Sequence, residues 1–137
     1  MPNLTGVLET SLYVDELERS IRFYKEVFQL ESLMADARFC ALSVSDRQVL
    51  LLFRKGATTG PSETPGGVIP GHDATGRSHL AFSIVASELQ DWERRLADKK
   101  IAVESKVSWA RGGSSLYLRD PDGHLLELVT PGTWSIY

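Results

Sequence analysis

The feature that most constrains the fold is an order of elements that occurs twice. In each half of the 137-residue chain, a strand pattern precedes an amphipathic helix pattern, and further strand patterns follow. The halves cover residues 5–56 and 78–132, and a Gly- and Pro-rich stretch, residues 57–77, separates them. This repeat predicts an α+β fold with two βαβββ modules. We expect them to form a single domain, residues 1–137, with one curled mixed sheet and a concave site.

The first half has one strand with two unlike faces. Leu8, Leu12 and Val14 alternate with polar or amphipathic residues between them, which is the period of a strand. Glu9, Ser11 and Tyr13 would therefore share the opposite face. The predicted elements of this half are a strand over 7–14, a helix over 15–28 that Asp15 caps, and strands over 37–44 and 47–54.

The second half follows the same order. Its predicted elements are a strand over 78–85, a helix over 87–100 that Ser87 caps, and strands over 101–110, 114–120 and 124–130. An Asp-Pro-Asp-Gly turn, residues 120–123, precedes the last strand. The 57–77 stretch is long for a connection inside a compact domain, so we interpret it as a linker or a functional flap.

Aligning the two halves on their strands reveals four equivalent positions. When the last strands are aligned on the glycine that follows each, Leu51 lies at the position of Glu127. When the first strands are aligned, Glu9 lies at the position of His79. Three of the four positions therefore carry side chains that bind metal ions, and each points away from the most apolar side of its strand.

Glu127 needs compensation, because it lies between leucines and an unpaired buried carboxylate is costly. A metal ion held by Glu9, His79 and Glu127 would supply it. One imidazole and two carboxylates suit Mn, Fe, Co, Ni or Zn, and three protein ligands leave positions open for a chelating substrate. The alternative is an ion pair of Glu127 with Arg119, Arg111 or Arg77, with His79 as a core residue and Glu9 solvated.

Three stretches resemble the vicinal oxygen chelate superfamily of glyoxalase I, fosfomycin- and bleomycin-resistance proteins, methylmalonyl-CoA epimerase and extradiol dioxygenases. "SLYVDELERSIRFYKEVF" is similar to the family's opening strand and helix. "SHLAFSI" resembles the strand that supplies a metal His, and "LYLRDPDGHLLEL" resembles the closing strand with its ligand Glu. The resemblance implies metal positions at His79 and Glu127. Glu9 stands where many members have His, and Leu51 where glyoxalase I-like members have a carboxylate.

The resemblance leaves two functions open. The first is a lyase, isomerase or dioxygenase whose divalent ion polarises a small oxygenated substrate, with Glu9 as a catalytic base. The second is a metal-free drug- or ligand-binding protein of the bleomycin-resistance type. Fosfomycin modification is not expected, because residues 106–115 lack the basic, hydroxyl-rich loop of members with that activity. The candidate substrate-binding residues are Ser11, Tyr13, Leu51, His72 and Arg111.

The composition argues against two classes of binding partner. The net charge is −3 and basic residues form no cluster, so neither nucleic acid nor a membrane surface is an expected partner. No apolar stretch approaches the ~20 residues that span a bilayer. The single cysteine, Cys40, cannot form an internal disulfide, which favours the cytoplasm. The family resemblance implies a homodimer, and Trp134 and Tyr137 are candidate contacts.

Overall fold

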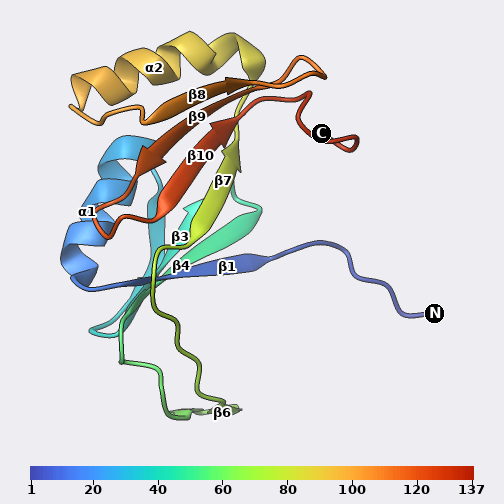
Figure 1. Ribbon diagram of the computed structural model, residues 1–137. Coiled ribbons are helices and arrows are strands. Elements are labelled where there is room, and N and C mark those ends of the chain that lie inside the picture. Colours follow the sequence, from blue (N-terminus) through green and yellow to red (C-terminus); the bar gives the residue numbers. More distant parts are fainter. The chain divides into compact units, whose positions relative to one another are not determined.

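The fold consists of two compact units of similar construction. A computed structural model describes all 137 residues, and its backbone contacts divide the chain into Met1–Gly76 and Arg77–Tyr137. Each unit contains one long helix and a four-stranded mixed sheet (Figure 1). The predicted α+β class is confirmed. The single curled sheet of the prediction is replaced by two separate four-stranded sheets, one in each unit.

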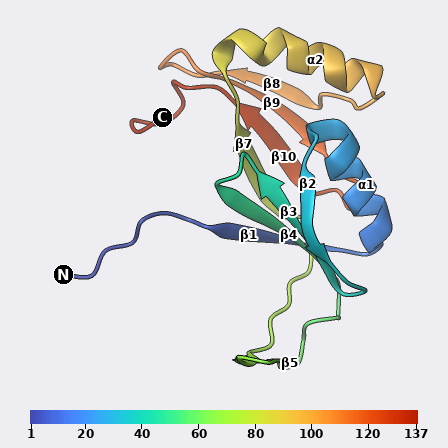
Figure 2. The ribbon, with the colours of Figure 1, turned by 180° about the vertical axis from the view of Figure 1, so that it is seen from behind.

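The first unit is built on a sheet with the strand order β1-β4-β3-β2. β1 and β4 are parallel and the other neighbours are antiparallel. α1 packs on β3 and β4 (Figure 2), and Leu17, Tyr24 and Val27 form its buried side. The elements are β1 (Glu9–Val14), α1 (Leu17–Phe28), β2 (Glu31–Ala35), β3 (Phe39–Val44), β4 (Gln48–Arg54), β5 (Ser62–Thr64) and β6 (Gly67–Ile69).

The second unit repeats this arrangement with the strand order β7-β10-β9-β8. β7 and β10 are parallel, and β9 is antiparallel to both β10 and β8. α2 runs alongside β8 and β9 (Figure 1). The elements are β7 (His79–Ser83), the 3₁₀ turn η1 (Ala86–Glu88), α2 (Leu89–Asp98), β8 (Ser105–Ser108), β9 (Ser114–Arg119) and β10 (Leu125–Val129).

The strand registers support the duplication. In the first unit, Glu9 lies opposite Val49, and Leu51 is two residues further along β4. In the second unit, His79 lies opposite Leu125, and Glu127 is two residues further along β10. The equivalence inferred from the sequence, Glu9 with His79 and Leu51 with Glu127, therefore follows from backbone pairing.

The local predictions that fail concern caps and ends. Asp15 does not cap α1, because its carboxylate pairs with Lys55 at 3.2 Å and the helix begins after Glu16 without a side-chain cap. Ser87 falls inside η1, so α2 also lacks a side-chain cap. Leu8 precedes β1 and is exposed rather than part of the core.

The stretch over residues 57–77 is not simply a loop. It contains the β5–β6 hairpin and belongs to the first unit. Gly71 allows the two arms of this segment to approach closely, since a Cβ there would lie 2.3 Å from the carbonyl oxygen of Thr59. No helix in the structure has both the length and the apolar character needed to cross a bilayer.

Candidate metal centre and ligand pocket

Glu127 lies on β10, inside the sheet of the second unit. Leu126 and Leu128 are fully buried on one side of the strand, and Glu127 is only 7% exposed on the other. The Ser115 hydroxyl donates a hydrogen bond of 2.5 Å to Glu127 Oε1. Ser115 in turn accepts a bond of 2.7 Å from Trp109 Nε1. A buried carboxylate that accepts such a bond keeps part of the stabilisation that water would give it.

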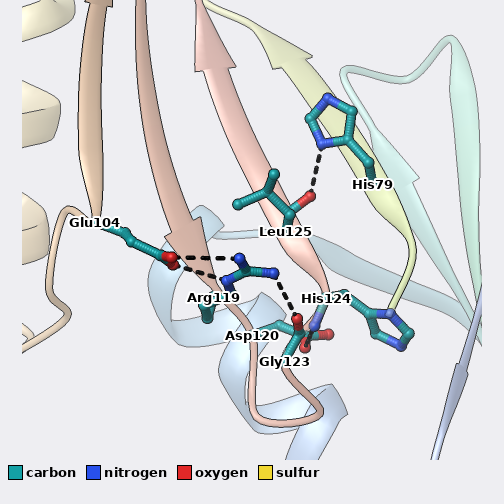
Figure 3. A network of polar contacts seen from close by, with 7 residues as sticks. All are labelled: His79, Glu104, Arg119, Asp120, Gly123, His124 and Leu125. Carbon is teal, nitrogen blue, oxygen red and sulfur yellow. Dashed lines mark hydrogen bonds and ion pairs between the residues drawn. The ribbon is translucent and has the colours of Figure 1, made fainter. Parts of the chain in front are cut away.

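His79 is the second group at this carboxylate. Its Nε2 lies 3.2 Å from Glu127 Oε2, and its Nδ1 lies 2.9 Å from the carbonyl oxygen of Leu125 (Figure 3). A carbonyl only accepts, so Nδ1 carries a proton and donates it to Leu125. Nε2 therefore faces the carboxylate either as part of a charged imidazolium or with its lone pair. A backbone carbonyl on the far nitrogen is typical of a histidine that binds a metal through the near one.

The spacing of this pair suits a shared metal ion. Two donors that bind one ion at about 2.1 Å, about 90–110° apart, lie roughly 3.0–3.4 Å from each other. The separation between His79 Nε2 and Glu127 Oε2 falls in that range. The His79 side chain is about half exposed, so the pair remains open on one side. Imidazole nitrogen with carboxylate oxygen is a donor set for divalent transition metals.

Tyr117 lies opposite Glu127 on β9 and takes part in the same network. Burial raises the pKa of the Tyr117 phenol above its usual value, and the Glu127 charge and its hydrogen bond raise the pKa further. The tyrosine therefore stays neutral at physiological pH and can donate to the carboxylate.

The ion-pair alternative for Glu127 is wrong. Arg119 instead donates to the Glu104 carboxylate, from Nε at 2.7 Å and Nη2 at 3.3 Å, and to the carbonyl oxygen of Gly123 at 3.0 Å (Figure 3). The hydrogen bond from Arg119 lowers the pKa of Glu104 below its usual value. Neither Arg111 nor Arg77 forms an ion pair with Glu127.

The predicted turn before β10 organises the start of that strand. Asp120 Oδ1 accepts the backbone N–H groups of Asp122 and His124 at 2.9 Å each, and Gly123 has a positive φ of 81°. His124 is buried, and its Nδ1 accepts the N–H of Ser78 at 2.9 Å. These residues are structural, and they fix the position from which β10 begins.

The first unit contains a pocket of about 570 Å³. Its lining combines aromatic and aliphatic side chains with hydroxyl groups, one imidazole and two charged groups. Of the predicted residues, Glu9, Ser11, Tyr13, Leu51 and His72 line it. Sequence reasoning missed the remaining lining residues, which are Thr10, Arg38, Phe39, Phe53, Thr58, Ser62 and Ile69.

Tyr13 and His72 form a hydrogen-bonded pair in this pocket. The Tyr13 hydroxyl lies 2.5 Å from His72 Nδ1. Two bonds to Thr58 hold the histidine: its N–H donates to the Thr58 carbonyl at 2.8 Å, and the Thr58 hydroxyl donates to its carbonyl at 2.9 Å. His72, which lies in the stretch predicted to be a linker or a functional flap, thus contacts Tyr13 of β1.

Arg111 is not among the pocket residues. It is exposed in the turn between β8 and β9 of the second unit, where Trp109 and Gly113 pair through their backbones. Neither unit by itself brings three His, Cys, Asp or Glu side chains together at metal-binding distance. Glu9 belongs to the first unit, whereas His79 and Glu127 belong to the second.

Ser115 and Tyr117, which contact Glu127, were not predicted. Both are on β9, and the alternation along that strand could have placed them on the face of Glu127. The antiparallel register that pairs Tyr117 with Glu127 was needed to identify them.

Comparison with known proteins agrees with this arrangement. The metallothiol transferase FosB of Staphylococcus epidermidis is 26% identical over 129 residues, which cover 93% of this chain and 82% of that protein. The catechol-2,3-dioxygenase of Bacillus subtilis is 31% identical over 137 residues, 95% of this chain and 44% of that protein. The crystal structure of a lactoylglutathione lyase from Agrobacterium tumefaciens superimposes with a TM-score of 0.88 at 30% identity, covering 98% of this chain and 99% of that one. Residues 6–128 match the Glyoxalase/Bleomycin resistance protein/Dioxygenase superfamily, and the chain therefore belongs to that superfamily.

Proposed function

We propose that this protein is a metal-dependent enzyme acting on a small oxygenated substrate. His79 and Glu127 would hold a divalent ion together with Glu9. The observation that carries the proposal is the pair of donors His79 Nε2 and Glu127 Oε2, 3.2 Å apart, with His79 Nδ1 already bonded to a carbonyl. The names of the relatives support it, since they include a metallothiol transferase, a dioxygenase and a lyase.

The residues of the site would have different roles in the reaction. When bound, a divalent ion supplies Lewis-acid stabilisation of negative charge on the substrate oxygens. Ser115 and Tyr117 orient the Glu127 carboxylate through the network around it. Tyr13 and His72 bind the substrate by hydrogen bonds, while Ser11 and Leu51 shape the pocket. Glu9 would accept a proton from the substrate as a base when it is not bound to the metal.

Metal analysis of purified variants tests the proposal. Protein prepared without an affinity tag would be reconstituted separately with Mn, Fe, Co, Ni and Zn, desalted and analysed by elemental mass spectrometry. We expect near-stoichiometric metal in the wild type and at least tenfold weaker retention in Glu9→Gln, His79→Ala and Glu127→Gln. Glu104→Gln is the control, because Glu104 pairs with Arg119 away from these residues. A wild type that stays empty with all five metals contradicts the proposal.

The pocket of the first unit favours a second candidate, a metal-free ligand-binding protein. A pocket whose lining surface is mostly apolar can retain a small molecule without any metal. In that case ligand affinity would be unchanged by a chelator and by Glu127→Gln. Under the first proposal, both treatments would weaken binding of an oxygen-chelating substrate.

Two further proposals concern the oligomeric state and fosfomycin. We infer that the protein is a cytoplasmic homodimer. Exposed apolar groups such as Trp134 and Ile136 near the end of the chain suit the contact between the two copies. Sedimentation at several protein concentrations would report the assembly. We expect no fosfomycin modification. Loss of free fosfomycin in the presence of metal and a thiol would contradict that expectation.

A further inference from the structure

Three aromatic side chains form a row across the sheet of the first unit. Tyr13 on β1 lies directly opposite Phe53 on β4, and Phe53 lies directly opposite Phe39 on β3. The ring centroids are 5.7 Å apart for Tyr13 and Phe53 and 5.9 Å apart for Phe53 and Phe39. All three rings line the pocket and are only partly buried, so each has surface available to a ligand.

His72 adds a fourth ring at the side of this row. Its centroid is 4.6 Å from that of Phe53 at an interplanar angle of 70°, and 5.8 Å from that of Tyr13. The bonds to Thr58 hold the His72 backbone in place, and the Tyr13 hydroxyl bonds the Nδ1 atom of its ring. The pocket therefore has rigid aromatic walls in two orientations, one along the sheet and one across it.

The duplication provides an internal comparison for the row. The equivalent positions in the second unit are Ser83, Val129 and Ser115, which pair across β7, β10 and β9 in the same register. The same sheet thus forms with small or aliphatic residues at all three positions. The folding of a module does not require aromatic rings there, so the row in the first unit needs another explanation.

Charge does not provide that explanation. Apart from His72, the ionisable side chains that line the pocket are Glu9, Tyr13 and Arg38. Arg38 already donates to Ser62 Oγ at 3.0 Å and to its neighbour Asp36 at 3.3 Å. One acidic group and one paired basic group give the pocket no strong preference for an ion.

We propose that this pocket is a subsite for an aromatic ring, and that the substrate or ligand of the protein carries one. The ring packs against the faces and edges of Tyr13, Phe39 and Phe53, and the Tyr13–His72 pair bonds a polar substituent on it. Offset and edge-to-face ring contacts favour an aromatic ligand over a saturated one of the same size by about two- to twelvefold each. The inference rests on the proposed use of this pocket as the ligand site and is independent of the metal.

Phenol and cyclohexanol are the probes, because both are uncharged at pH 7 and carry one hydroxyl on a six-membered ring, and only the phenol ring is aromatic. Their binding to the full chain would be measured by ligand-detected NMR titration with a chelator present. We expect phenol to bind about tenfold more tightly than cyclohexanol. Equal affinities, or no binding of phenol, would overturn the inference.

A matched pair of variants locates the binding. Phe53→Leu should weaken phenol binding by about two- to twelvefold, the contribution of one ring contact, while Phe23→Leu, the same change on α1 outside the pocket, should leave it unchanged. Phe39→Leu is the second test if Phe53→Leu does not fold, as judged by its thermal transition. Phenol binding that survives the pocket variants, or that is lost equally with Phe23→Leu, rejects the site. Loss of metal binding alone leaves the aromatic subsite standing and refutes only the metal proposal.

Discussion

Ser115→Ala tests whether the Ser115 hydroxyl is what makes the buried Glu127 tolerable. The substitution removes the donor 2.5 Å from Glu127 Oε1 and the acceptor of Trp109 Nε1. A hydrogen bond to a charged group contributes about 1.5–3 kcal/mol, and here both partners are buried. Trp109 is 37% exposed, so its N–H can turn to water and adds little. We therefore expect a loss of about 2–3 kcal/mol in the free energy of unfolding.

Urea unfolding measures this loss. With a slope of about 1–3 kcal/mol per molar urea, the midpoint should fall by roughly 0.7–3 M with the slope unchanged. Ser114→Ala is the control, because it removes a neighbouring hydroxyl while the backbone bond from Ser114 to Thr130 remains. The control should shift stability by less than about 0.5 kcal/mol. If Ser115→Ala behaves like the control, Ser115 does not stabilise Glu127. Metal affinity is a second readout, and it should fall by about 10–100-fold.

Two further predictions concern the rest of the fold. Gly71→Ala should destabilise the chain by about 1–3 kcal/mol in urea unfolding, because the new Cβ would lie 2.3 Å from the Thr59 oxygen. Gly66→Ala has open space and should be neutral, and equal effects would contradict this account. Glu104 has a lowered pKa because Arg119 bonds it, so its stabilisation is complete above about pH 4.5 and is lost as pH falls through the folded-state pKa. The melting temperature of Glu104→Gln should therefore lie below that of the wild type at pH 7, and the gap should close as the pH falls through the folded-state pKa of Glu104. A gap that does not change with pH refutes the linkage.

Much of the architecture was predictable because it depends on local patterns. Alternation along β1, the apolar run of β10 and the helical spacing in α1 reflect how each element is buried, and the structure confirms both strands and the helix. The turn at Ser45 and Asp46 was also predictable, and both residues have φ near 54°. The helix starts were not, because Asp15 had a competing partner in Lys55 from a distant strand.

The candidate site was likewise only partly predictable from the sequence. The repeat in the sequence was sufficient to make Glu9, Leu51, His79 and Glu127 equivalent in pairs, because a duplicated strand keeps its period of two residues. It could not identify Ser115 or Tyr117 as partners of Glu127, because that depends on the antiparallel register of β9. The tertiary structure also decided whether an arginine pairs with Glu127, since Arg119 bonds Glu104, the residue just before β8, instead.

The sequence by itself determined the class of fold, its two modules and the residue types able to bind a metal, since these follow from periodicity and side-chain chemistry along the chain. The tertiary structure decided which groups meet. Cross-strand pairing built the aromatic row of Tyr13, Phe53 and Phe39, and the close approach at Gly71 fixed His72 beside it. Contacts between residues far apart in the chain depend on register and on backbone approach, and neither is encoded in the spacing of any single segment.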